Sequence, residues 1–283
     1  MKTTNPVLAR LGQAAERERA AGYAQPGPYG QPGYPQQYQY PTGGYAPPQY
    51  PTASGYPAAP PTVTPMTLDD VVVKTVMLLG ILGASAAAAW VLVPDALVSV
   101  AWIGAAVVGL ALGLIISFSR MANPALVVAY SIVEGVFVGM VSKAFESLYD
   151  GIVLQAVVAS FGVFFLMAMI YKARVIRATP RFARIMISIM VGLFAAMLIN
   201  LVLALFGINT HLRDGSPLAI GFSLVCIVVA SLSFVLNFHE IEEGVRMGLP
   251  QRYSWTAAFG IVVGLVWLYL EILRLLSYFQ GDD

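Results

Sequence analysis

The sequence predicts an all-α membrane protein with seven transmembrane helices and a disordered N-terminal tail. Three observations support this prediction. First, 58% of the 283 residues are apolar and only 11% are charged, whereas about 25% of the residues in an average soluble domain are charged. Second, apolar stretches of roughly 20 residues, the length that crosses a bilayer, recur after residue 67. Third, the segment before these stretches is rich in Pro, Gly, Gln and Tyr.

The composition divides the chain into three parts. Residues 1–22 form a short helix-capable segment, in which Leu8, Leu11 and Ala15 lie at helical spacing. Residues 23–66 have no aliphatic set to bury, so we expect a disordered cytoplasmic tail. This tail is either simply solvated or a docking site for a partner that recognises proline-rich chains. Residues 67–279 form the transmembrane domain. The chain starts without the apolar core of a signal peptide, so we expect no cleavage.

Helix boundary signals separate the apolar stretches. Asp69 and Asp70 follow Thr67, a pattern typical of a first helical turn. A Pro-Asp pair at residues 94–95 ends the first span, and an Asn-Pro pair at residues 123–124 precedes the third. The seven predicted spans are Thr75–Val93, Val98–Phe118, Ala125–Phe145, Ile152–Tyr171, Ile185–Phe206, Pro217–Leu236 and Trp255–Phe279.

The distribution of basic residues between the spans predicts the orientation. The loop after the fourth span carries Lys172, Arg174, Arg177, Arg181 and Arg184, whereas the loops on the opposite side carry almost none. Because basic loops stay in the cytoplasm, we expect a multi-pass protein of the plasma membrane with its N-terminus in the cytoplasm and its C-terminus outside. The basic loop would also suit the head groups of anionic lipids. The basic residues do not lie along one face, so we expect no nucleic-acid partner.

The last span has one face that is unsuited to lipid. Gly260, Gly264, Trp267, Glu271 and Arg274 recur at steps of three and four residues and therefore share one side of a helix. A GxxxG pair lets another backbone approach closely, and a carboxylate or guanidinium group is costly against lipid. We therefore expect this helix to lie inside a bundle. Glu271 either pairs with Arg274 or takes part in sensing ions or pH.

Glu134 is the sharpest single candidate for chemistry. It lies about ten residues into the third span, near the bilayer midplane. An ionised carboxylate costs at least a few kcal/mol there, so the group must be protonated, paired or in a water-filled cavity. One interpretation is the handling of ions or protons. The other is a hydrogen bond to Tyr130, one turn earlier, with tight packing at Gly135 and Gly139.

An acidic cluster follows the sixth span. Glu240, Glu242 and Glu243 come directly after His239. The resulting HExxE spacing differs from the HExxH of zinc proteases, whose ligands are two histidines, so we expect no metal site. The cluster is either a solvated helix end or part of a gating network with nearby arginines. Nucleophile-elbow and phosphate-loop motifs are missing from the sequence as well, and we expect no catalysis and no bound cofactor beyond transiently held calcium.

Several segments, taken in order, carry a family resemblance. They are an asparagine-proline pair before AYSIVEGVFVGMVS, then LNFHEIEEGVRMGLPQRYSWTAAFG after the sixth span, and LVWLYLEILRLLS in the last span. This order resembles the Bax inhibitor-1 family of membrane proteins. The start NPVLARLG, the Pro/Gly/Tyr/Gln-rich tail and TLDDVVVKT are similar to the actinobacterial branch of that family. The resemblance covers roughly Thr67 to Ser277 and the first dozen residues.

The resemblance implies six helices packed around the seventh and, in some members, a pH-sensitive calcium leak. In those members two aspartates share a proton and pair with an arginine from the second span. Here Asn237 and Gly264 stand at the two aspartate positions, and Arg120 is the candidate arginine. Arg274 completes our set of gating-pair candidates with Arg120 and Asn237. The ion-sensing and pH-sensing candidates are Glu134, Glu271, Glu240, Glu242 and Glu243.

Two functions remain open at this point. In the first, the bundle conducts protons or calcium, and protonation of a carboxylate changes the packing around the last span; burial favours the protonated form. In the second, the protein conducts nothing and binds other membrane proteins, which in the resembled family include a quality-control protease. A wet cavity at Glu134 would favour the first function, and a dry bundle with every carboxylate paired would favour the second. The oligomeric state is not predicted.

Overall fold

The computed structural model describes residues 64–119, 122–208, 212 and 215–281. This part of the chain contains seven helices that are long and apolar enough to cross a membrane, which confirms the predicted fold class. The predicted N-terminal segment and most of the tail lie outside it. The helices are α2 (Leu68–Leu92), α3 (Val98–Phe118), α4 (Pro124–Glu146), α5 (Ile152–Lys172), α6 (Pro180–Leu205), α7 (Pro217–Arg246) and α8 (Tyr253–Gln280), with a short 3₁₀ turn, η1 (Asp95–Leu97), before α3.

Local sequence signals set where the helices begin. Thr67 caps α2 through a reciprocal pair of hydrogen bonds: the Asp70 backbone N–H donates to Thr67 Oγ1 over 3.1 Å, and the Thr67 N–H donates to Asp70 Oδ2 over 3.0 Å. Asn123 and Ser216 cap α4 and α7, and each is followed by proline at the first helical position, where no N–H is needed. The sixth predicted span ends at residue 236, whereas α7 continues to Arg246 and so carries the acidic cluster on its last turns.

Replacing Thr67 with alanine is expected to lower the stability of the bundle by about 1 kcal/mol, because the Asp70 backbone N–H at the start of α2 loses its acceptor, Thr67 Oγ1. Thermal unfolding in detergent micelles measures this change. Thr67→Ser keeps the hydroxyl group and should unfold at nearly the wild-type temperature. An equal loss in both variants would contradict the assigned cap.

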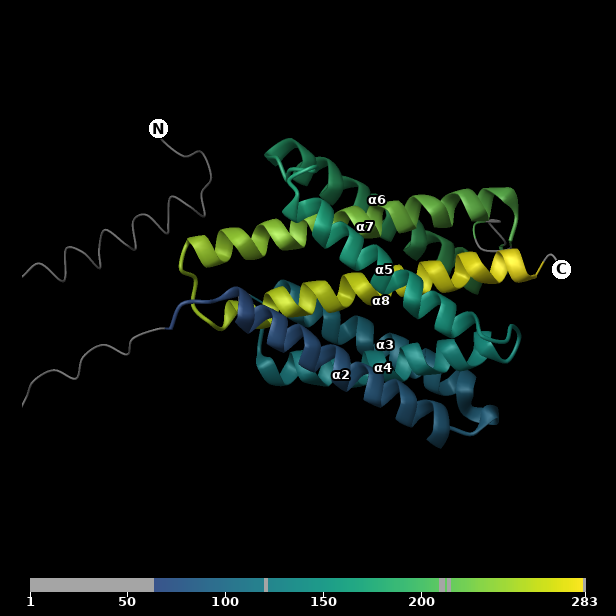
Figure 1. Cartoon of the computed structure of the whole chain (residues 1–283). Coiled ribbons are helices and arrows are strands. Elements are labelled where there is room, and N and C mark those ends of the chain that lie inside the picture. The colour runs from purple at the N-terminus through teal and green to yellow at the C-terminus, as the bar shows by residue number, and fades with distance from the viewer. Residues whose placement is uncertain (1–63, 120–121, 209–211, 213–214, 282–283) are drawn as a thin grey trace, which may run out of the picture. The chain divides into compact units, whose positions relative to one another are not determined.

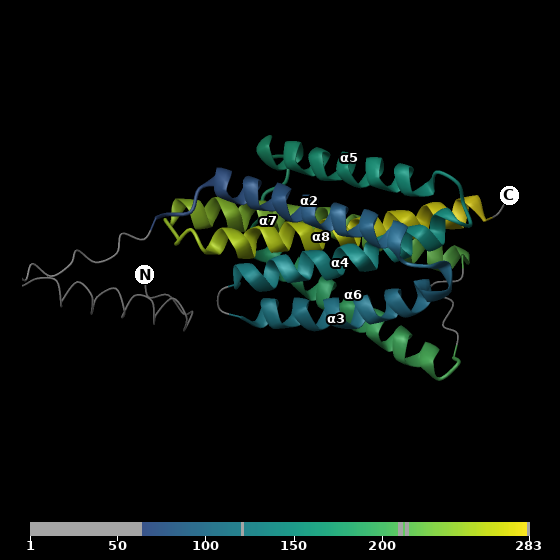
Figure 2. The same ribbon diagram turned by 90° about the horizontal axis from the view of Figure 1, so that it is seen from below.

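Helix α8 is the centre of the bundle (Figures 1 and 2). In its most apolar window 61% of the residues are buried, against 6% for α6. The backbones of α2, α4, α5 and α7 all contact α8, whereas α3 packs on α4 and α6 packs on α7. The predicted central position of the C-terminal helix is therefore confirmed, with two of the six surrounding helices one layer further out.

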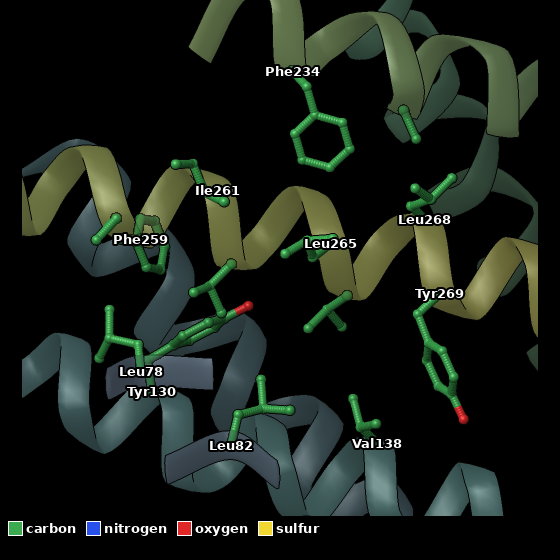
Figure 3. Close-up of a cluster of buried hydrophobic side chains, with 14 of the residues drawn as sticks. Leu78, Leu82, Tyr130, Val138, Phe234, Phe259, Ile261, Leu265, Leu268 and Tyr269 are labelled. Carbon is green, nitrogen blue, oxygen red and sulfur yellow. The ribbon is translucent and has the colours of Figure 1, made fainter. Parts of the chain in front are cut away.

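Side chains from several helices converge on α8 (Figure 3). Leu78 and Leu82 reach it from α2, Tyr130 from α4 and Phe234 from α7. The ring of Tyr130 meets that of Phe259 edge-on with the centroids 5.0 Å apart. Such aromatic pairs stabilise a core beyond the area that they bury. This packing holds α8 between two groups of helices.

Helices α2 and α4 approach each other unusually closely. A Cβ atom added at Gly135 would lie 2.4 Å from the carbonyl oxygen of Leu82, and one added at Gly139 would lie 2.5 Å from that of Ala86. Ser85 Oγ also donates a hydrogen bond to the carbonyl of Ile132 over 2.7 Å. The two glycines therefore let the backbones touch, as small residues do in other membrane bundles.

The chain just before α2 is attached to the α7–α8 connection. The Met66 N–H donates to the carbonyl of Leu249 over 2.7 Å, and the Gln251 N–H donates to that of Thr64 over 3.0 Å. Met66 is only 3% exposed. Composition assigns residues 64–66 to the tail, but the structure packs them against the transmembrane domain.

Candidate functional site

Glu134 lies on α4, half-buried, and faces α3. A Cβ atom added at Gly109 of α3 would come within 2.9 Å of Glu134 Oε2, and one added at Gly113 would lie 3.5 Å from the ring of Tyr130. Tyr130 lies one turn earlier on the same side of α4. The side chains of Glu134 and Tyr130 therefore pack against Gly109 and Gly113, which have the GxxxG spacing on α3.

A hollow of about 320 Å³ opens beside this pair. Its polar side chains are Glu134, Tyr130 and Ser117, and the rest of its lining is apolar and comes from α3, α4, α6 and α8. Phe194 of α6 and Phe259 of α8 are among its lining residues. Three polar groups around a space of this size are enough to hold water, which needs two to four polar partners. Within the described part of the chain no basic side chain forms an ion pair with Glu134.

Glu271 has a different environment near the end of α8. It is 2% exposed, and its Oε1 accepts a hydrogen bond from Arg274 Nη1 over 2.9 Å. Ser223 Oγ of α7 lies 3.4 Å from Glu271 Oε2. The other members of the predicted face, Gly260, Gly264 and Trp267, are also covered at least in part. Glu271 is therefore held by a cation on its own helix, unlike Glu134.

Asn237 and Gly264 both lie in the interface between α7 and α8, but they do not meet. Asn237 Nδ2 donates to the carbonyl of Gly260 over 3.4 Å. A Cβ atom at Gly264 would lie 3.0 Å from the ring of Phe234, so the phenyl group occupies the space beside that glycine. Arg120, the third gating candidate, lies outside the described residues. The two positions at which the resembled calcium-leak proteins carry aspartates are therefore occupied by uncharged residues in this chain.

The three glutamates of the acidic cluster point to different surroundings. Glu240 lines a hollow of about 210 Å³ next to α8, together with Asn237. Glu242 accepts a hydrogen bond from the Tyr171 hydroxyl of α5. Glu243 pairs with Arg246 over 2.5 Å at the exposed end of α7. Among the described residues no three or more His, Cys, Asp or Glu side chains converge as a metal site would require.

Sequence analysis missed a polar attachment between α2 and the start of α8. Lys74 Nζ donates to Ser254 Oγ and lies 5.4 Å from the centre of the Trp255 ring. Gln251 Nε2 donates to Asp70 Oδ1 over 2.6 Å. A lone lysine one turn after an aspartate was the available signal, but its partners lie about 180 residues further along the chain. The attachment fixes the ends of both helices.

An apolar groove also escaped prediction. It has a volume of about 540 Å³, and α2, α4, α5 and α8 all contribute to its lining. Trp90 and Phe161 are among its lining residues. A hydrogen bond of 2.6 Å joins Ser142 and Tyr269 in its largely apolar wall. In the described part of the chain the backbones of α2 and α5 do not contact each other, which leaves the groove between them.

A family model described as "Bax inhibitor 1 like" matches residues 5–281, nearly the whole chain. No curated protein sequence matches the chain.

Proposed function

The chain belongs to the Bax inhibitor 1 like family, and from this membership and the site at Glu134 we propose that it is a pH-sensitive leak for calcium ions or protons. The observation that carries the proposal is the hollow of about 320 Å³ beside Glu134, in which no described basic residue neutralises the carboxylate. A carboxylate at this depth of the membrane is costly unless water or a cation accompanies it. An unneutralised carboxylate in a hollow attracts cations.

The packing of Glu134 supports a gate that responds to protonation. Its carboxylate lies against Gly109 of α3, and the neighbouring Tyr130 packs against Phe259 of the central helix α8. Loss of the negative charge would remove the attraction for cations and would let α3 and α4 close on the hollow. We propose that Glu134 is the titrating group. Three of the other glutamates are held by partners: Glu271 by Arg274, Glu242 by Tyr171 and Glu243 by Arg246. Glu240, which lines the hollow of about 210 Å³, is the remaining competitor that the flux measurement must exclude.

The orientation of the leak follows from the basic loop. We propose that the protein lies in the plasma membrane with its N-terminus in the cytoplasm, because the five basic residues between α5 and the start of α6 favour the cytoplasmic side. The acidic end of α7 and the attachment at Lys74 would then face the cytoplasm, and the Glu271–Arg274 pair would lie near the outer surface. The proposed activity needs no catalytic residue and no bound cofactor.

A flux measurement tests the proposed gate. The full chain is reconstituted into liposomes, and calcium and proton flux are followed between about pH 5 and pH 8. Because protonation removes the negative charge that attracts cations, we expect wild-type flux to fall on the order of tenfold as the pH is lowered through this range. Glutamine imitates the protonated carboxyl group, so Glu134→Gln should show at every pH the flux that the wild type shows at its acidic limit. The triple variant Glu240→Gln/Glu242→Gln/Glu243→Gln should keep the wild-type pH dependence.

Two results would contradict this proposal. Flux no greater than that of empty liposomes, from protein that unfolds at its normal temperature, would exclude the leak. A pH response that disappears in the triple variant and persists in Glu134→Gln would move the sensor to the acidic end of α7.

The apolar groove between α2 and α5 favours a second candidate function. A groove of about 540 Å³ with an almost entirely apolar lining suits lateral contact inside the membrane. We propose as the alternative that the protein conducts nothing and regulates other membrane proteins, such as a quality-control protease, by binding them. Cross-linking from Trp90→Cys in native membranes would then capture a partner, whereas the same substitution would leave ion flux at the background level.

A further inference from the structure

A basic hollow lies where α5 and α7 end. It has a volume of about 610 Å³, and its charged side chains are Lys172, Arg174, Arg177 and Glu242, joined by His239. Apolar residues including Leu68 of α2 and Ile176 complete the lining. The site at Glu134 has no residue in common with this hollow.

The charge of the basic hollow is positive and largely uncompensated. Three fixed cations face one carboxylate, and that carboxylate already accepts a hydrogen bond from the Tyr171 hydroxyl. Within the described residues none of the three cations forms an ion pair. Arginine forks bind phosphate oxygens in a bidentate manner, and lysine binds them as a point charge. The hollow therefore suits an anion with several oxygen atoms.

Backbone strain also marks this place. Arg174 adopts the left-handed conformation with φ of 55°, the only described residue besides glycines to do so. The Arg174 N–H donates to the carbonyl of Tyr171, and the Val175 N–H donates to the carbonyl of Ile170. Helix ends with these two hydrogen bonds usually have glycine at the position of Arg174. A side chain here costs free energy that glycine would avoid. Strain of this kind is typical of functional positions, and here it directs an arginine to the hollow.

The hollow lies at the level where the apolar helices end. Lys172 is the last residue of α5, Leu68 is the first residue of α2, and His239 follows the last apolar turn of α7. A ligand bound there would have water on one side and hydrocarbon on the other. We propose that the basic hollow binds the phosphate head group of an anionic phospholipid, with Arg174 and Arg177 on the phosphate and Leu68 and Ile176 against its glycerol end.

Lipid titration of the purified full chain in neutral detergent tests the proposal, with bound lipid counted by native mass spectrometry. Phosphatidylglycerol should bind more tightly than phosphatidylcholine. Arg174→Gly and Arg177→Ala should each weaken phosphatidylglycerol roughly fivefold, the effect of one basic residue at a membrane surface. Arg181→Ala, which removes the same charge from the first turn of α6, outside the hollow, should change binding less than twofold.

The variant Arg174→Gly separates lost binding from lost folding. Without lipid it should unfold roughly 2–4 °C above the wild type, because glycine relieves the strain at this position. Equal weakening by Arg181→Ala would overturn the proposal, since the summed positive charge of the α5–α6 connection and the start of α6 would then attract the lipid. Inorganic phosphate that competes at the affinity of the lipid would also overturn it, because the site would then bind a free anion.

Discussion

Replacing Gly135 with alanine is expected to destabilise the bundle by about 3 kcal/mol, at the upper end of the cost of overpacking. The new Cβ atom would lie 2.4 Å from the backbone oxygen of Leu82 and 2.7 Å from Ser85 Cβ. Backbone atoms cannot rotate away as the end of a flexible side chain can, so α2 and α4 must separate. The double variant Gly135→Ala/Gly139→Ala should yield no folded protein. Thermal unfolding and the recovery of monodisperse protein in detergent measure both effects.

The matched control is the same substitution at Gly104 of α3. A Cβ atom there would meet nothing within 4 Å. Alanine forms helix more readily than glycine, by up to about 1 kcal/mol in water, so Gly104→Ala should leave the unfolding temperature unchanged or raise it. A loss of stability at Gly104 equal to that at Gly135 would show that glycine itself, and not the contact with Leu82, is required.

The sequence predicts the fold far better than it predicts the site. Long apolar stretches with Thr67, Asn123 and Pro217 at their starts define the spans, because boundary signals act within one helical turn. The small residues Gly135 and Gly139 signal close packing, but the sequence cannot say against which helix. That choice depends on how seven helices of nearly equal hydropathy fit together.

The partners of the charged residues could be predicted only where they are local. Glu271 and Arg274 are three residues apart on one helix, so their pairing follows from spacing alone. Glu242 and Tyr171 are 71 residues apart, and Lys74 and Ser254 are 180 apart, so only the assembled bundle brings them together. The left-handed conformation of Arg174 has no sequence signal, because glycine is the residue usually found there.

Removing the cation of the Glu271–Arg274 pair is expected to have the second large effect. Arg274→Ala should destabilise the bundle by about 3–5 kcal/mol, because it leaves a buried carboxylate without its charged partner. Ser223 Oγ, at 3.4 Å from Glu271 Oε2, cannot replace a guanidinium group at 2.9 Å. The double variant Glu271→Leu/Arg274→Leu should lose much less than Arg274→Ala, since no charge then remains buried. Thermal and denaturant unfolding in detergent micelles compare the two.

The chain offers an internal control for this comparison. Glu243 and Arg246 have the same three-residue spacing, but their side chains are 35% and 74% exposed, against 3% and 22% for Glu271 and Arg274. Water screens the exposed pair, so Arg246→Ala should produce no resolvable change in the unfolding temperature. If Arg274→Ala were equally mild, water would have to reach Glu271 in the folded protein. Glu271 would then be accessible to water, as we propose for Glu134, and the proposed leak would have a second place for a proton or a cation to bind.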